Sequence, residues 1–237
     1  MPALFALLAL LACESDPAPA APDEGPVALD TAAEVVPGRF GFPIPERERI
    51  DALVGVDHDP VVQTGILAAG LCDDYLGRPF PHCYDEHDGS DYLLDGGFPA
   101  MDAGSPDVVA AEDGVVVDAH DGEYDRCHVE GTGISCDGNS GIANYVILEH
   151  TDGWRTLYWH LQKDSVGVAV GDEVTCGEVV GRIGSSGYSS APHLHFEVQD
   201  ASGAVVDPYA GPYSQPESEW AGQGLVDELP EPGCTQP

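Results

Sequence analysis

The chain has 237 residues, 43% of them hydrophobic, so it is long enough to bury one sizeable core and to carry additional tails. Its 42 acidic residues outnumber its 8 basic residues and give a formal net charge of −34, which repels phosphate backbones, so we expect no nucleic-acid partner. The 29 glycines and 20 prolines, without long helical periodicity, favour an all-β protein rich in turns over a helical bundle.

The N-terminus predicts a targeting segment. Residues 1–12 contain an uncharged run of mostly Leu and Ala that is too short to span a bilayer as a helix. The run ends in Leu10-Leu11-Ala12-Cys13, which resembles the lipobox of bacterial lipoproteins, where the cysteine carries the lipid. No Lys or Arg precedes the run, and a secretory signal with an incidental cysteine is the alternative. We expect a signal peptide over residues 1–12 and a membrane anchor on Cys13. Because Glu14 rather than Asp follows, we expect the outer membrane, with the chain facing the periplasm or the cell surface.

The cysteine count agrees with export. Of the seven cysteines, six remain once Cys13 is set aside, and an even remainder in an exported protein indicates three disulfides. Six cysteines allow 15 connectivities, and the sequence does not choose among them. Short spacing favours Cys72–Cys83 and Cys127–Cys136, which leaves Cys176–Cys234. A zinc site made of cysteines is not favoured, because the chain has no C-x-x-C pair.

Composition divides the rest of the chain into three parts. Residues 13–37 are rich in Pro, Ala, Asp and Glu and predict a flexible tether. Residues 38–212 predict the folded domain, and the polar residues 213–237 predict a C-terminal tail fixed by Cys234. A weak pattern indicates a short helix within Ile50–Gly70. Short β-rich runs bounded by turn residues predict strands at Gly114–Val117, Asn144–Glu149, Trp154–His160, Val166–Val170, Glu173–Thr175, Val179–Ile183 and Leu194–Val198.

Three short motifs contain residues that suit metal chemistry. His193 and His195 lie two apart in an alternating run, so on a strand they share a face, about 6.5 Å apart at Cα, with Leu194 turned toward the core. His87 and Asp91, separated by a glycine-containing turn, can converge on one ion, although a solvated loop is the simpler interpretation. In Tyr158-Trp159-His160-Leu161, strand alternation puts Tyr158 and His160 on one face and Trp159 on the other, and a core histidine is the alternative for His160.

Together and in this order, H-x-x-x-D, Y-x-H-L and H-L-H-F-E resemble the lysostaphin-type zinc metallopeptidases, which are peptidoglycan endopeptidases. The resemblance runs from about Tyr84 to Tyr209. It includes Ala110-Ala111-Glu112-Asp113-Gly114-Val115-Val116, Asn144-Tyr145-Val146-Ile147-Leu148-Glu149-His150, Gly171-Asp172-Glu173-Val174 and Gly181-Arg182-Ile183-Gly184-Ser185-Ser186-Gly187. It implies an all-β fold of antiparallel sheets with long loops, the duplicated hybrid motif of this family.

The resemblance also implies the roles of five residues. His87, Asp91 and His195 would bind one Zn²⁺ per chain, His193 would act as general base, and His160 would orient the water or stabilise the oxyanion. Two neutral imidazoles and one carboxylate leave a charge of about +1 and an open fourth position on zinc, as catalytic rather than structural sites do. The implied substrate is a peptide of peptidoglycan cross-links or stems.

Three departures and one alternative remain. Ala191 stands where the family often has Gly, Tyr188 adds bulk, and the loop from Asp121 to Gly141 is long, so these bear on substrate preference. The alternative is a non-catalytic lysostaphin-fold lipoprotein that binds the cell wall and regulates another hydrolase, and the presence of all five residues argues against it.

We expect a monomer. The other histidines are interpreted as surface, loop or structural residues, with a second metal at His120 and His128 as the less favoured alternative: His58, His82, His120, His128 and His150.

Overall fold

The computed structural model describes residues 38–62 and 71–234 of the chain. The predicted signal peptide over residues 1–12, the anchor on Cys13 and the tether over 13–37 lie outside the described residues and stay predictions. Within the described ranges no helix has the length and apolar character needed to cross a membrane.

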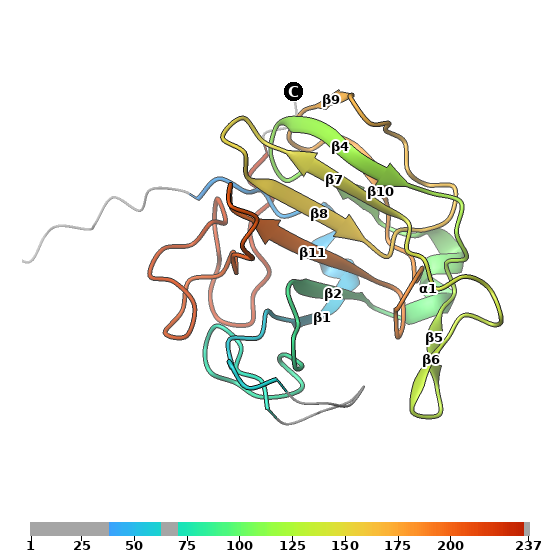
Figure 1. Cartoon of the computed structure of the whole chain (residues 1–237), viewed down its shortest axis with the longest axis horizontal. Helices are drawn as coiled ribbons and strands as arrows, with labels where there is room; N and C mark the ends of the chain where they lie inside the picture. The colour runs from blue at the N-terminus through green and yellow to red at the C-terminus, as the bar shows by residue number, and fades with distance from the viewer. Residues whose placement is uncertain (1–37, 63–70, 235–237) are drawn as a thin grey trace, which may run out of the picture. The chain divides into compact units, whose positions relative to one another are not determined.

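A seven-stranded antiparallel sheet dominates the fold, with the strand order β1-β2-β11-β8-β7-β4-β9 (Figure 1). Its strands are β1 (Ile50–Val54), β2 (Ser90–Leu94), β11 (His193–Gln199), β8 (Arg155–Trp159), β7 (Tyr145–Glu149), β4 (Gly114–His120) and β9 (Glu173–Val174). Two smaller antiparallel pairs join β3 (Asp107–Val109) to β10 (Val179–Arg182) and β5 (His128–Glu130) to β6 (Gly133–Ser135). The helical segments are η1 (Arg47–Arg49) and α1 (Gly97–Gly104). The predicted all-β class with antiparallel sheets is confirmed.

One predicted strand is wrong, and the predicted short helix is absent from residues 50–62, while 63–70, the rest of its range, lie outside the described residues. The segment Ile50–Val54 is not helical but forms β1, because its backbone pairs with β2 from Ile50↔Leu94 to Val54↔Asp91. The run Val166–Val170 is not a strand. The nearby backbone bonds connect it to two separate strands, from Gly167 N to Val180 O and from Gly171 N to Val116 O, so no continuous ladder forms.

One face of the large sheet is buried in the core. Leu194 and Phe196 on β11 are fully buried, as the alternation of this strand predicts. The core also takes side chains from both ends of the described chain, since the rings of Phe196 and Trp220 stack with centroids 5.5 Å apart and Phe42 lies 6.0 Å from Trp220. The segment 213–237, which we expected to be a polar tail, therefore supplies a buried indole to the domain.

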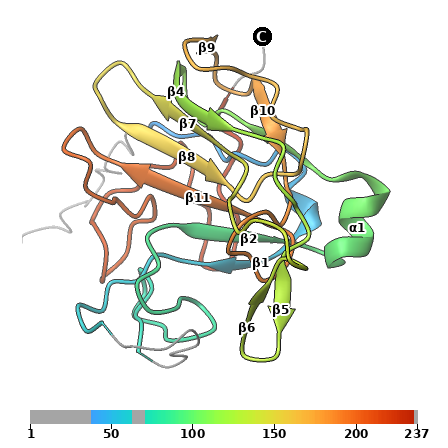
Figure 2. The same ribbon diagram turned by 45° about the vertical axis from the view of Figure 1, so that its right-hand side comes forward.

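Three disulfides are present: Cys72–Cys83, Cys127–Cys136 and Cys176–Cys234, the pairing that the spacing favours. The second of them closes the base of the hairpin β5–β6, which extends away from the large sheet (Figure 2). The third joins the segment after β9 to the end of the described chain, so it holds the stretch that contains Trp220 against the domain.

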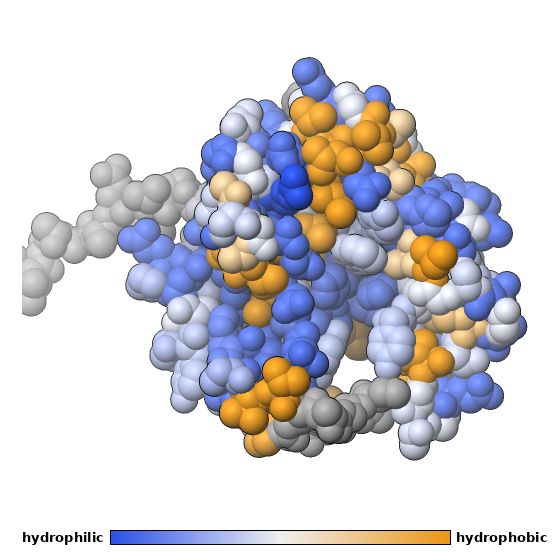
Figure 3. All heavy atoms as spheres, viewed as in Figure 1, coloured by the Kyte–Doolittle hydropathy of each residue, from blue (hydrophilic) through white to orange (hydrophobic). Residues whose placement is uncertain are grey.

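Hydrophilic residues cover most of the molecular face shown in Figure 3, interrupted by a few hydrophobic patches. Every arginine has a carboxylate partner, so the cationic side chains are largely neutralised and the surplus charge of the surface is negative. The pairs are Arg39–Glu112, Arg47–Glu231, Arg49–Glu46, Arg78–Asp74, Arg126–Asp102, Arg155–Glu149 and Arg182–Asp107.

Candidate metal centre

Two neighbouring strands bring Asp91 and His195 together. β2 and β11 pair antiparallel with Asp91 directly opposite His195, so both side chains project from the same face of the sheet. This is the face opposite the core, because the alternate residues Leu194 and Phe196 are buried on the other side. His87 reaches the same point from the turn that leads into β2, where its backbone N–H donates to Tyr84 O.

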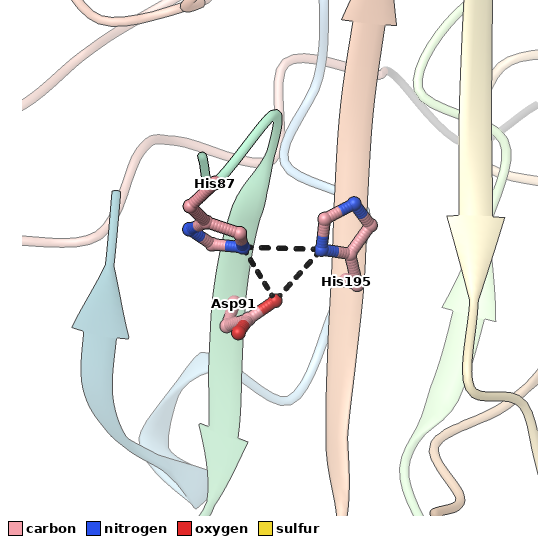
Figure 4. Close-up of side chains that lie close together, drawn as sticks. All are labelled: His87, Asp91 and His195. Carbon is pink, nitrogen blue, oxygen red and sulfur yellow. Dashed lines mark hydrogen bonds and ion pairs between the residues drawn. The ribbon is translucent and has the colours of Figure 1, made fainter. Parts of the chain in front are cut away.

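The three side chains place one ligand atom each at the corners of a small triangle (Figure 4). His195 Nδ1 lies 2.9 Å from Asp91 Oδ1, and His87 Nε2 lies 3.2 Å from each of these two atoms. Ligand atoms 2.0–2.1 Å from a tetrahedral zinc ion are separated by about 3.3 Å, so the triangle has the size that a single Zn²⁺ requires. His87 and Asp91 are buried and His195 is partly exposed, which leaves one side of the triangle open. In the described ranges this is the one group of three His, Cys, Asp or Glu residues arranged to hold a metal.

Two contacts outside the triangle orient His87. Its Nδ1–H donates to Gly55 O at 2.7 Å, which leaves the lone pair on Nε2 directed at the other two ligand atoms. The ring of Tyr84 stacks on His87 at 4.0 Å, and its hydroxyl donates to Asp91 Oδ2 at 3.4 Å, on the carboxylate oxygen that the triangle does not use. Sequence reasoning missed both groups. A backbone carbonyl carries no side-chain signal, and Tyr84 lies outside the H-x-x-x-D motif.

Gly89 lies between His87 and Asp91, and its backbone passes so close to β11 that a side chain would not fit. The close contact, and not an unusual backbone conformation, requires glycine here. A Cβ at this position would lie 2.6 Å from two atoms of the His195 ring and 2.9 Å from Phe196 O. The absence of a side chain therefore allows the turn before β2 to pass directly beside the ring of His195, a candidate metal ligand.

Substituting Gly89→Ala is expected to displace the His195 ring and to weaken zinc binding about 10- to 100-fold, the range found when a ligand loses its supporting contacts. A competition titration of zinc against a chromophoric chelator measures the change. Gly141→Ala is the matched control, because a Cβ there meets no atom within 4 Å. Zinc affinity equal to wild type in Gly89→Ala would show that the ring accommodates the methyl group and that the close approach has no bearing on the site.

His193 lies on the same sheet face, two residues before His195. Its Nδ1–H donates to Ala191 O at 2.7 Å, with Ser189 Oγ at 3.2 Å, so Nε2 is left as an acceptor. That Nε2 is 3.5 Å from Asp91 Oδ1, at the edge of the ligand triangle. His193 is therefore beside the triangle, with its Nε2 directed toward Asp91.

His160 also reaches the site, but by a route that strand alternation does not predict. Tyr158 faces the core, where it is fully buried and accepts hydrogen bonds from Ala111 N and Thr156 Oγ1, while Trp159 pairs with His195 on the opposite face. The prediction that Tyr158 and His160 share a face is wrong. β8 ends at Trp159, and His160 adopts a left-handed φ of 64°, which turns its ring to within 4.7 Å of the His193 ring.

The electrostatics of the cluster follow from its burial. Burial raises the pKa of the Asp91 carboxyl, but the neighbouring imidazoles of His87, His193 and His195 outweigh it and hold that pKa well below its usual range. Burial, helped by the neighbouring histidines, lowers the pKa of His160 to about 3, so this ring is neutral. Burial also lowers the pKa of His195, but hydrogen bonds to Asp91 and Glu197 outweigh it and raise it to about 9, so a bound cation must compete with that proton.

Four of the other histidines have partners elsewhere in the fold. His58 Nε2 lies 2.8 Å from Asp207 Oδ2, and His120 Nε2 lies 3.0 Å from Glu123 Oε1. His128 Nδ1–H donates to Arg126 O, and His150 contacts Asp113 O and Thr156 Oγ1. The structure brings together His87, Asp91, His160, His193 and His195, and these four stay outside that cluster.

Comparison with known proteins identifies the family. The model of peptidase family M23 matches residues 86–208, which is 123 of the 237 residues and includes all five clustered side chains. The chain is 32% identical over 163 residues to the DD-carboxypeptidase/endopeptidase Mpg of Neisseria meningitidis, covering 69% of this chain and 30% of Mpg. It is 31% identical over 112 residues to the peptidoglycan DD-endopeptidase ShyA of Vibrio cholerae, covering 47% of this chain and 20% of ShyA. It is 48% identical over 60 residues to lysostaphin of Staphylococcus simulans, covering 25% of this chain and 12% of lysostaphin. The chain thus spans less than a third of the length of these relatives.

Proposed function

The chain belongs to peptidase family M23, and we propose that it is a zinc-dependent endopeptidase that hydrolyses peptide bonds in peptidoglycan cross-links or stem peptides. The observation that carries the proposal is the triangle of His87, Asp91 and His195 with two further imidazoles beside its open side. The names of Mpg and ShyA support it, since one is an endopeptidase and the other is an endopeptidase of peptidoglycan.

The donor set fits zinc, because imidazole nitrogens and a carboxylate oxygen are among its usual ligands and three protein ligands leave a position for water or substrate. Zinc bound by these residues supplies polarisation of the peptide carbonyl and lowers the pKa of the attacking water to about 7. His87 and Asp91 are held for this task by Gly55 O and by the Tyr84 hydroxyl.

The two histidines outside the ligand triangle, His193 and His160, have different roles toward the attacking water. His193 Nε2 takes the proton of the attacking water and returns it to the leaving amine, since its Nδ1–H is already donated to Ala191 O. His160 donates Nδ1–H to Ser186 O at 2.6 Å and stays neutral, so its Nε2 accepts a hydrogen bond and orients the water. Both rings thus present an acceptor nitrogen for the water, and both are fixed by a backbone carbonyl.

We place this activity in the cell envelope, on the peptides of peptidoglycan. An anchor on Cys13 would hold a monomeric domain at the membrane through the predicted tether over residues 13–37. The alternative of a non-catalytic wall-binding regulator shares the family fold, and hydrolysis separates the two.

The proposed function is tested with the purified mature chain and purified sacculi. Soluble muropeptides are expected to appear with about one zinc per chain, to disappear after chelation and to return when zinc is restored. Liquid chromatography with mass spectrometry measures the products. Sacculi that stay intact with the zinc-loaded chain would contradict the proposed function and favour the regulator.

A further inference from the structure

The strand registers place the metal ligands at one end of a row that crosses five strands. Asp91 on β2 is opposite His195 on β11, and His195 is opposite Trp159 on β8. The register Val146↔Tyr158 puts Tyr145 on β7 beside Trp159, and Tyr145 is opposite His120 on β4. Residues in such a row project from the same face, so three aromatic rings continue the metal site across the sheet.

These rings stack on one another. The indole of Trp159 and the ring of Tyr145 lie 4.6 Å apart at an interplanar angle of 23°, and Tyr145 and His120 lie 6.0 Å apart at 30°. Tyr145 therefore covers one face of the indole. Because β7 and β11 flank β8 on opposite sides, the other face of the indole is turned toward β11, the strand that carries His193 and His195. Trp159 is partly exposed, and among the described residues no aromatic ring stacks on this second face.

Carboxylates lie beside the free face of Trp159 and farther along the row. Glu197 follows His195 by two residues on β11 and projects from the same sheet face, diagonal to Trp159 across the β11–β8 pair. Farther along the row, Asp118 accepts a hydrogen bond from the Tyr145 hydroxyl at 3.1 Å, and Glu123 contacts His120 at 3.0 Å. No arginine balances these groups, since each one is paired with another carboxylate.

We propose that the free face of Trp159 and the carboxylate of Glu197 form a subsite that binds a positively charged amine of the substrate peptide, next to the bond being cut. An aromatic face attracts a cation within about 6 Å of its centroid, and a neighbouring carboxylate adds to that attraction. The ring of Tyr145 stacks on the opposite face of the indole and holds it in position. The neighbouring carboxylates repel a negatively charged carboxylate of the substrate from this subsite. The inference rests on the proposed function and names the chemistry of the peptide that this site selects.

The test compares untreated sacculi with sacculi whose free amines have been acetylated, which removes the positive charge and leaves the peptide bonds unchanged. Wild type is expected to release muropeptides about tenfold faster from untreated sacculi, a ratio that matches the strength of a partly desolvated cation–π contact. The variant Trp159→Leu is expected to digest both substrates at equal rates while keeping one zinc per chain. Trp159→Phe retains a ring and is expected to keep a preference, which separates the role of the ring face from a general loss of packing.

Trp154→Leu is the matched control, because this tryptophan lies at the other end of the β7–β8 hairpin under Arg39. It is expected to keep the tenfold preference for untreated sacculi. Equal digestion of both substrates by wild type would overturn the subsite, and so would a preference that persists in Trp159→Leu. Failure of wild type to release anything from untreated sacculi would instead overturn the proposed function, and the subsite with it.

Discussion

Substituting His193→Ala is expected to lower the rate of muropeptide release about a thousandfold while one zinc per chain stays bound, because positioned general bases contribute roughly 10²–10⁴-fold to catalysis. The side chain lies outside the ligand triangle, with its Nε2 3.5 Å from Asp91 Oδ1 and its Nδ1–H donated to Ala191 O. Alanine therefore removes the acceptor of the proton without removing a metal ligand.

The rate of muropeptide release from sacculi tests the expected loss of activity, and metal analysis of the same preparation tests the expected retention of zinc. His128→Ala is the matched control, since this histidine lies on β5 and donates to Arg126 O, away from the cluster. It is expected to retain wild-type hydrolysis and zinc. Full hydrolysis by His193→Ala would remove His193 from the mechanism, and loss of zinc would assign it to the ligands instead.

Substituting His195→Ala or Asp91→Ala is expected to remove both zinc and hydrolysis. Each change leaves two ligand atoms of the triangle, and Asp91 is also the group that neutralises part of the charge of the ion. Loss of a ligand should weaken binding by more than the roughly 10- to 100-fold that follows from loss of an outer contact. Metal analysis after dialysis against a weak chelator measures the zinc content.

Asp88→Ala is the control for Asp91→Ala, because Asp88 lies in the same turn but is exposed to solvent. It should bind zinc as wild type does. If Asp91→Ala kept stoichiometric zinc after dialysis, the triangle could not be the metal site, whatever happened to activity.

The motifs indicate the candidate metal centre from the sequence because its residues follow simple local rules of strand geometry. The period of two in His193-Leu194-His195-Phe196 predicts which side chains face the core, and the structure has Leu194 and Phe196 fully buried. The pairing of Asp91 with His195 is harder to predict from the sequence, because it depends on β2. This strand is buried at nearly every position, so its sequence shows no alternation that would identify it.

The remaining features depend on contacts that a linear pattern does not encode. His160 reaches the cluster through a left-handed backbone conformation after β8, so the alternation rule fails at that residue. Gly55 orients His87 through a backbone carbonyl, and any residue type supplies one. Trp220 enters the core from a segment whose polar composition resembles a tail. A single indole buries a large apolar area, but it hardly changes the average hydrophobicity of a segment with many polar residues, so composition does not reveal its burial.

The central claim is that zinc held by His87, Asp91 and His195 cuts peptidoglycan peptides with His193 as base. Mass spectrometry of sacculi digested by zinc-loaded wild type and by zinc-loaded His193→Ala tests it most directly, because the masses of the products also identify the bond. The prediction is a set of muropeptides with one new amine and one new carboxyl terminus per cut in the wild-type digest, and their near absence with the variant. Identical product spectra from the two proteins, or no products from either, would contradict the claim.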